Sequence, residues 1–314
     1  MKENKQKLTS LAAKAALILV AILWGSSLVV AKSSVESISP SLLIAMRFAI
    51  ACVLLSVIFV RRLRIITRDD LLGGAIIGLF LFGAYWIQTL GITLAMPGKS
   101  GFLSSVYCVM VPFTTWLMCR VRPCGRNVAA AVLCVTGIAL ASVTEGFSIE
   151  LGDMLALLSG VFYALHITSV RKYGQGRDPI VMTILQFGFC ALYALAATWM
   201  VDGAHPLFSP DAFGSVLYLA LFCTAAALLL QNVAQKVTEP SSASIFLSTE
   251  SIWSVFFSVW VYGEQVTPRM WIGFAMIFAA VLISERGGVK GVRLRAISVL
   301  PTMRRAIGGS NCRR

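Results

Sequence analysis

Long apolar segments separated by short basic connections are the feature that most constrains how this chain folds. An apolar run of about 17–25 residues can cross the hydrocarbon core of a bilayer as a helix. Ten runs reach or approach this length, and they lack the alternation of polar and apolar residues that marks membrane-spanning strands. The sequence therefore predicts an all-α integral membrane protein with ten transmembrane helices. The predicted spans are Leu11–Ala31, Ser41–Val60, Leu71–Ile92, Gly101–Met118, Val128–Val143, Met154–Val170, Ile180–Met200, Phe213–Leu230, Ser241–Val261 and Met270–Ile283.

Composition excludes a soluble domain. Charged residues make up 13% of the chain and hydrophobic residues 58%, whereas soluble proteins carry about 25% charged residues. A soluble fold of this size leaves much of its surface in water, so lipid must cover the apolar excess.

The basic residues predict the orientation in the membrane. With the amino terminus in the cytoplasm, most of the 27 lysines and arginines fall in cytoplasmic segments. The exceptions are Lys32, Lys99 and Arg269 outside, and Arg47 within the second span. The positive-inside rule then places both termini in the cytoplasm. Since the net charge of +13 follows from this topology, it calls for no nucleic-acid partner.

The two halves of the chain resemble each other. At an offset of 139 residues, Trp24 aligns with Tyr163 and Arg47 with Gln186. Farther along, an offset of 144 aligns Phe102-Leu103-Ser104 with a second Phe-Leu-Ser, which places Glu250 opposite Val106. Each half contains five spans, an odd number, so the second half crosses the membrane in the opposite sense.

This register divides the chain into three parts. We predict a first five-helix repeat over residues 1–145, a second over 146–285 and a basic cytoplasmic tail over 286–314. Inverted repeats are typical of secondary transporters, which hold the substrate near the midplane between the repeats. We therefore expect a pseudo-two-fold axis in the membrane plane to relate the two repeats, and the substrate site to lie on that axis.

Several short motifs add a resemblance to a known family. They are Trp24-Gly25-Ser26-Ser27, Pro40 followed by Arg47-Phe48, Ala95 before Leu103-Ser104-Ser105, Gly152-Asp153, Gly263-Glu264, Pro268 and Trp271-Ile272-Gly273. With these motifs, residues 12–285 resemble the bacterial drug/metabolite transporters of the EamA type. The resemblance implies a multi-pass protein of the inner (plasma) membrane that exports an amino acid, another metabolite or a drug. The sequence departs from the family where Cys119-Arg120 replaces a Gly-Glu pair.

Two ionisable side chains are predicted at membrane depth, and such residues are candidates for function. Arg47 has two interpretations: a structural group that reaches the interface or a carboxylate, or a contact to the substrate or coupling ion. Glu250 is either a satisfied structural acid or a protonatable group that couples transport to protons. We expect both to face the cavity between the halves.

Four further side chains are predicted to line that cavity. Trp24 and Tyr163 are repeat partners, and aromatic packing is their alternative role. Tyr107 can hydrogen-bond a substrate or pack between helices. His166 lies midway along the sixth span, where a lone histidine is often only a hydrogen-bonded packing residue.

Enzyme chemistry finds little support in the sequence. The chain has two histidines and contains no HExxH, GxSxG or Walker motif, so we expect no catalytic residue, metal or cofactor. The expected partners are a small-molecule substrate, the lipid bilayer and protons as a candidate coupling ion. A membrane-embedded hydrolase or transferase is the alternative to transport, while substrate identity, direction and oligomeric state stay open.

Overall fold

The computed structural model describes residues 2–120, 122–142, 150–203, 206–235, 246–247 and 249–287. Over these ranges the chain is helical, and its one β-type pairing is an isolated bridge between Ile38 and Phe208. The helices are α1 (Lys2–Ser34), α2 (Pro40–Ile58), η1 (Val60–Ile65), α3 (Arg68–Leu94), α4 (Pro97–Ser104), α5 (Tyr107–Cys119), α6 (Gly125–Ser142), α7 (Leu151–Gly174), α8 (Pro179–Val201), η2 (Pro210–Ala212), α9 (Phe213–Tyr218), η3 (Leu219–Ala226), α10 (Ala227–Gln235), α12 (Glu250–Tyr262) and α13 (Pro268–Gly287).

Seven helical stretches among the described residues are long and apolar enough to cross a membrane. They include α1, α2, α3, α7 and α8, the pair α4–α5, and the continuous run from η2 to α10. Helices α6 and α13 are shorter apolar helices, in line with the short fifth and tenth spans. The start of the ninth predicted span, at residues 241–245, lies outside the described residues, as does most of the predicted tail from residue 288.

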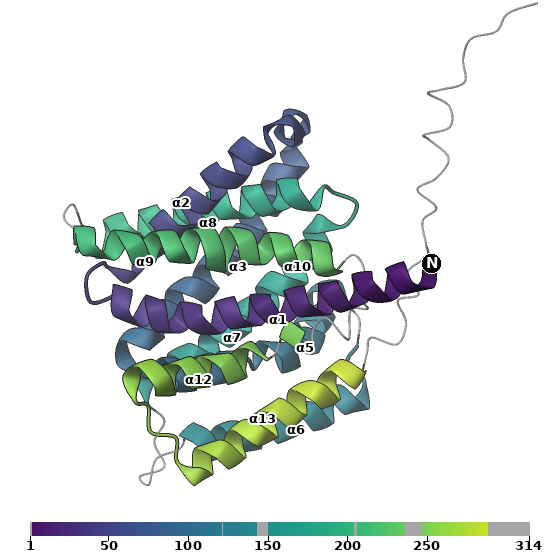
Figure 1. The fold of residues 1–314 in the computed structure, drawn as a ribbon, viewed down its shortest axis with the longest axis vertical. Helices are drawn as coiled ribbons and strands as arrows, with labels where there is room; N and C mark the ends of the chain where they lie inside the picture. The colour runs from purple at the N-terminus through teal and green to yellow at the C-terminus, as the bar shows by residue number, and fades with distance from the viewer. Residues whose placement is uncertain are drawn as a thin grey trace, which may run out of the picture.

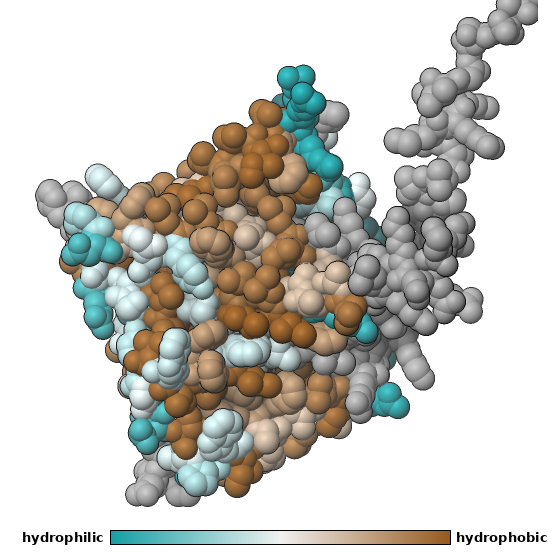
Figure 2. Space-filling view, in the orientation of Figure 1, coloured by the Kyte–Doolittle hydropathy of each residue, from teal (hydrophilic) through white to brown (hydrophobic). Residues whose placement is uncertain are grey.

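The helices lie side by side with their axes running across the view in Figure 1. Apolar side chains cover the middle of the visible face, and hydrophilic side chains gather toward the left, where several helices end (Figure 2). This distribution is expected for helices whose outer faces contact lipid and whose ends reach water.

Proline marks the first residue of several helices. Helices α2, α4, α8 and α13 begin at Pro40, Pro97, Pro179 and Pro268, where the missing proline N–H is no loss because first-turn amides have no intrahelical partner. Pro112, which lies inside the fourth span and predicts a kink there, is accommodated within α5. The span also breaks at residues 105–106, where the backbone N–H groups of Ser105 and Val106 each donate to the carbonyl three residues back.

Helices α5 and α12 have the same local backbone geometry. Each follows a right-handed turn residue, Val106 or Thr249, whose N–H donates to the carbonyl three residues back. Each ends at a residue in the left-handed region, Arg120 with φ 60° or Gly263 with φ 63°. The offset between these paired positions is 143 residues, not the 144 taken from side-chain identities.

The change of one residue alters which side chains correspond. Glu250 now pairs with Tyr107, the first residue of α5, and no longer with Val106. Backbone turns and caps define the register more reliably here, because isolated identities between helices of similar composition arise easily.

Two helix pairs join the two halves of the chain. Helix α2 packs on α8, where Phe48 and its offset partner Phe187 meet edge to face at 5.3 Å between ring centroids. Helix α6 packs on α13 along one edge of the bundle (Figure 1). The space between these two pairs holds the candidate site.

Candidate substrate cavity

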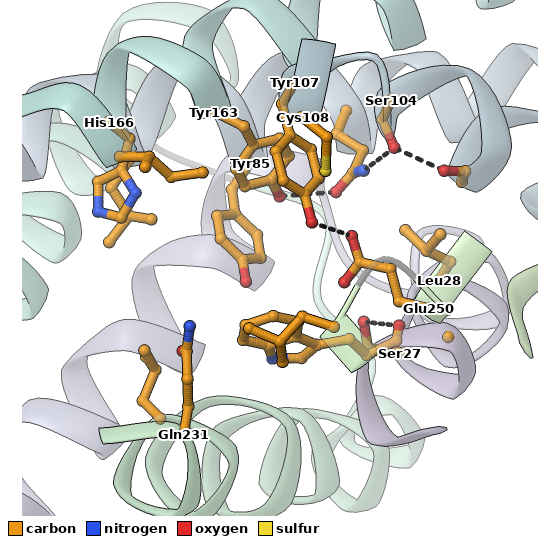
Figure 3. A pocket seen from close by; sticks show the side chains of 18 of the residues that line it. Ser27, Leu28, Tyr85, Ser104, Tyr107, Cys108, Tyr163, His166, Gln231 and Glu250 are labelled. Atoms are coloured by element: carbon orange, nitrogen blue, oxygen red, sulfur yellow. Dashed lines mark hydrogen bonds between the residues drawn. The ribbon is translucent and has the colours of Figure 1, made fainter. Parts of the chain in front are cut away.

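A cavity of about 280 Å³ lies between the helices, and side chains from both halves line it. Five of the six residues predicted from the sequence are among them: Trp24, Tyr107, Tyr163, His166 and Glu250. The last four are labelled in Figure 3. They come from α1, α5, α7 and α12, so the fold gathers residues separated by more than half of the chain.

Glu250 and Tyr107 are joined directly. The Tyr107 hydroxyl donates a hydrogen bond of 2.9 Å to Glu250 Oε1, and Figure 3 shows the carboxyl group turned toward the cavity. Each residue opens the helix that follows a break in its span. A backbone break at membrane depth is tolerated where it lines a polar cavity, so both side chains occupy positions suited to ligand contact.

Two consecutive hydrogen bonds connect three other side chains that line the cavity. The Tyr163 hydroxyl donates to Gln88 Oε1 at 2.8 Å, and Gln88 Nε2 donates to Ser104 Oγ at 3.1 Å. The Tyr163 ring also meets Tyr85 edge-on, with centroids 5.5 Å apart. These contacts hold the polar groups in fixed orientations, which is what a binding site needs to select one ligand geometry.

Trp24 and His166 are also anchored. The Trp24 indole donates through Nε1 to the Cys223 carbonyl at 3.1 Å. A ring nitrogen of His166, Nε2, lies 2.8 Å from Gln186 Oε1. Both residues therefore present one polar edge to a protein partner and the rest of the ring to the cavity.

Arg47 does not line the cavity. It is 4% exposed, and its Nε donates to Thr224 Oγ1 at 2.6 Å while Nη2 reaches the Cys223 carbonyl at 3.4 Å. Its guanidinium carbon lies 4.8 Å from the centroid of Tyr85, a cavity-lining ring. Arg47 thus sits behind the wall, and the ion pairs found among the described residues do not include it.

Sequence analysis did not assign Tyr85, Gln88, Gln186 or Gln231 to the site, yet all four line the cavity. The signal that could have found them is the same one that found Glu250, a polar side chain within a long apolar span. Glutamine and tyrosine carry that signal weakly because they are common in packed helices and at interfaces.

The cavity offers a carboxyl group, amides, hydroxyls and aromatic faces, a set suited to binding a small polar or amphipathic molecule. Within the described ranges, no group of three or more His, Cys, Asp or Glu side chains could hold a metal ion. What the arrangement supports is recognition by hydrogen bonds, together with a carboxyl that can take up or release a proton.

Comparison with known proteins agrees with this picture. The model of the EamA-like transporter family matches residues 12–143 and 150–285. An uncharacterized transporter of Archaeoglobus fulgidus is 31% identical over 268 residues, which cover 85% of this chain and 83% of that protein. The uncharacterized transporter YvbV of Bacillus subtilis is 22% identical over 274 residues, covering 85% of this chain and 89% of that protein.

A solved structure shares the fold. That crystal structure superposes with a TM-score of 0.60 at 18% identity and covers 87% of this chain and 96% of its own. The family and the curated relatives are named as transporters, which gives the membrane-enzyme alternative no support. The resemblance predicted from the sequence is confirmed, and the chain belongs to the EamA-like transporter family.

Proposed function

We propose that this protein is a secondary active transporter that exports a small metabolite, amino acid or drug across the plasma membrane by alternating access. The observation that carries the proposal is the cavity of about 280 Å³ between the two halves, with the Glu250 carboxyl facing it. Membrane transporters bind their substrates near the midplane at such an interface.

The proposal includes ten helices arranged as two inverted five-helix repeats, over residues 1–145 and 146–285, with both termini in the cytoplasm. The separate family matches to residues 12–143 and 150–285 support two units. The equal backbone geometry of α5 and α12 supports their correspondence. Further support comes from two contacts between paired residues, Phe48 with Phe187 and Tyr107 with Glu250, because paired residues can touch only near a two-fold axis.

Glu250 is the proposed coupling group. A carboxyl group that faces a cavity can exchange a proton with whichever side of the membrane the cavity opens to. Tyr107 stabilises its ionised form by donating a hydrogen bond. In this scheme the proton and the substrate alternate at Glu250, and Arg47 balances charge from behind the Tyr85 ring.

The test uses purified protein in liposomes, with a counterflow screen of metabolite pools to find a substrate. Glu250→Gln keeps the shape of the side chain and removes its titration. We therefore expect the variant to lose the pH dependence of transport and most of the transport that a proton gradient drives. Transport by Glu250→Gln with the pH profile of the unmodified protein would rule out the coupling role.

Tyr107→Phe is the matched control. It removes the hydroxyl that donates to Glu250 and leaves the carboxyl itself in place. The titrating group remains in this variant, so the pH dependence of transport should persist, with a changed midpoint. Loss of pH dependence in both variants would point to a shared structural role.

A further inference from the structure

One end of the helix bundle, at the left in Figure 1, is held together by a carboxylate. Just after α12, the Glu264 side chain accepts a hydrogen bond of 2.9 Å from the Gly98 backbone N–H and another of 2.9 Å from that of Lys99. Only 6% of Glu264 is exposed. Gly98 and Lys99 lie in the first turn of α4, where unpaired N–H groups favour a negative partner. Glu264 therefore ties α12 to α4.

A salt bridge extends this connection to a third helix. Lys99 Nζ lies 2.7 Å from Asp153 Oδ2, and the Asp153 side chain, in the first turn of α7, is fully buried. Glu150 is a weaker partner of the same ammonium group, at 3.7 Å. We call Glu264, Lys99 and Asp153 the latch. Through it, α12, α4 and α7 are joined at one end of the cavity.

In the sequence, the offset partners of the three latch residues are of different chemical kinds. The 143-residue offset pairs Glu264 with Val121 and Lys99 with Ser242, and the 139-residue offset pairs Asp153 with Lys14. The first carboxylate is thus replaced by an apolar side chain, the ammonium by a hydroxyl and the second carboxylate by a base. Residues 119–126 contain no acid, so this stretch has no carboxylate that could accept from a helix start as Glu264 does. At the end of the bundle where α3 begins, ion pairs of Arg62 with Asp178 and of Arg177 with Asp70 instead tie η1 and α3 to the connection between α7 and α8.

We propose that this one-sided latch sets the resting conformation of the transporter. The inference rests on the proposed function, since it assumes that the two halves exchange between states closed at one end or the other. Interactions present in only one of two states shift the population toward that state. The empty protein therefore rests closed at the latch end. With the amino terminus in the cytoplasm, that end faces outward, and the resting cavity is presented to the cytoplasm as an exporter requires.

The experiment measures access to the cavity from the latch side. Leu28 lines the cavity, and Leu28→Cys is exposed to a membrane-impermeant thiol reagent added to intact cells. Mass spectrometry of the peptide separates its labelling from that of the native cysteines. Glu264→Gln should raise the labelling rate roughly tenfold or more, because hydrogen bonds to an ionised acceptor are about twice as strong as neutral ones.

Glu36→Gln is the matched control. Glu36 is an exposed side chain at the same end of the bundle and lies outside the latch. This variant therefore removes one negative charge, as Glu264→Gln does, but breaks no latch contact. Its labelling rate should equal that of the Leu28→Cys parent. Equal acceleration by both variants would mean that charge at the membrane surface, rather than the latch, controls access.

A reciprocal variant tests the asymmetry. Adding Arg120→Gly and Val121→Glu to Glu264→Gln places a Gly-Glu pair at the offset partners of Gly263 and Glu264, and we expect labelling in inverted vesicles to slow. Unchanged labelling in Glu264→Gln, in protein that elutes as a single species, would overturn the proposal. If that variant does not fold, Lys99→Gln is measured instead against the same expectations. The labelling experiment needs no substrate. If Glu264→Gln speeds labelling but no transport is detected, the proposed transport function is contradicted and the latch proposal is not.

Discussion

Arg47 carries its charge within α2 and is satisfied without a carboxylate. The π-helix η3 supplies both of its hydrogen-bond acceptors, the Thr224 hydroxyl and the Cys223 carbonyl. The Cys223 carbonyl also accepts from the Trp24 indole, so one widened turn serves an arginine and a tryptophan together. Such turns occur often at functional sites. The Tyr85 ring adds a cation–π contact on the cavity side.

This arrangement predicts that Arg47 contributes mainly to stability. Arg47→Gln installs the residue found at its offset partner, Gln186, and loses the charged hydrogen bond and the ring contact. A hydrogen bond to a charged group contributes about 1.5–3 kcal/mol, so the midpoint of thermal unfolding in detergent should fall by several degrees. Thr224→Val removes the acceptor of Arg47 Nε and also the hydrogen bond that Thr224 Oγ1 donates to the Leu219 carbonyl. It leaves a buried charged donor without this partner, so it should lower the midpoint of thermal unfolding as well.

The two changes share one contact, so the double variant should be less destabilised than the sum of the single variants. Additive effects would instead mean that the contact between Arg47 and Thr224 contributes little to stability. Thermal unfolding of all four proteins, followed by intrinsic tryptophan fluorescence, distinguishes the two outcomes.

At the scale of helices, the contact between α6 and α13 depends on two glycines that face each other. A Cβ added at Gly137 would lie 2.8 Å from the Gly273 carbonyl oxygen, and one added at Gly273 would lie 2.7 Å from the Gly137 oxygen. Both obstacles are backbone atoms, which cannot move aside as a flexible side chain can. Small residues permit this approach between membrane helices, and here they let the last helix of each predicted repeat pack together.

Gly137→Ala should therefore separate α6 from α13 and lower the thermal midpoint of the detergent-solubilised protein. Overpacking of this kind costs typically about 1–3 kcal/mol. Gly214→Ala in α9 is the control, since a Cβ there meets nothing within 4 Å and alanine favours a helix. Equal stability of the two variants would mean that the α6–α13 contact is not tightly packed in the membrane.

For the whole molecule, the inverted-repeat proposal makes a sharp prediction about sidedness. Glu36 and Gln175 are paired at the 139-residue offset, and both side chains are exposed next to helix ends. Inversion of the second repeat requires paired positions to lie on opposite sides of the membrane. An impermeant maleimide added to intact cells should label Glu36→Cys, and Gln175→Cys only after permeabilisation. Labelling of both from the same side would exclude an odd number of crossings between them.

The helical membrane class and the family follow from sequence alone, because apolar run length, missing strand alternation and short motifs are local properties. Placement in the cavity was predictable for Trp24, Tyr107, Tyr163, His166 and Glu250, since polar and aromatic groups within apolar spans cluster at a repeat interface. The rotation of each helix about its axis is not local, and it decides that Tyr85 and Gln231 line the cavity while Arg47 lies behind its wall.

Long-range contacts likewise belong to the tertiary structure. Helix geometry, rather than residue identity, pairs Glu250 with Tyr107, and the fourth span breaks at residues 105–106, a position that no proline marks. The latch joins Glu264 to a helix start 166 residues earlier in the chain. The sequence alone determined which charged residues this protein contains. Only the packing of helices far apart in the chain decided which of them meet, because a hydrogen bond depends on positions in space that no local pattern encodes.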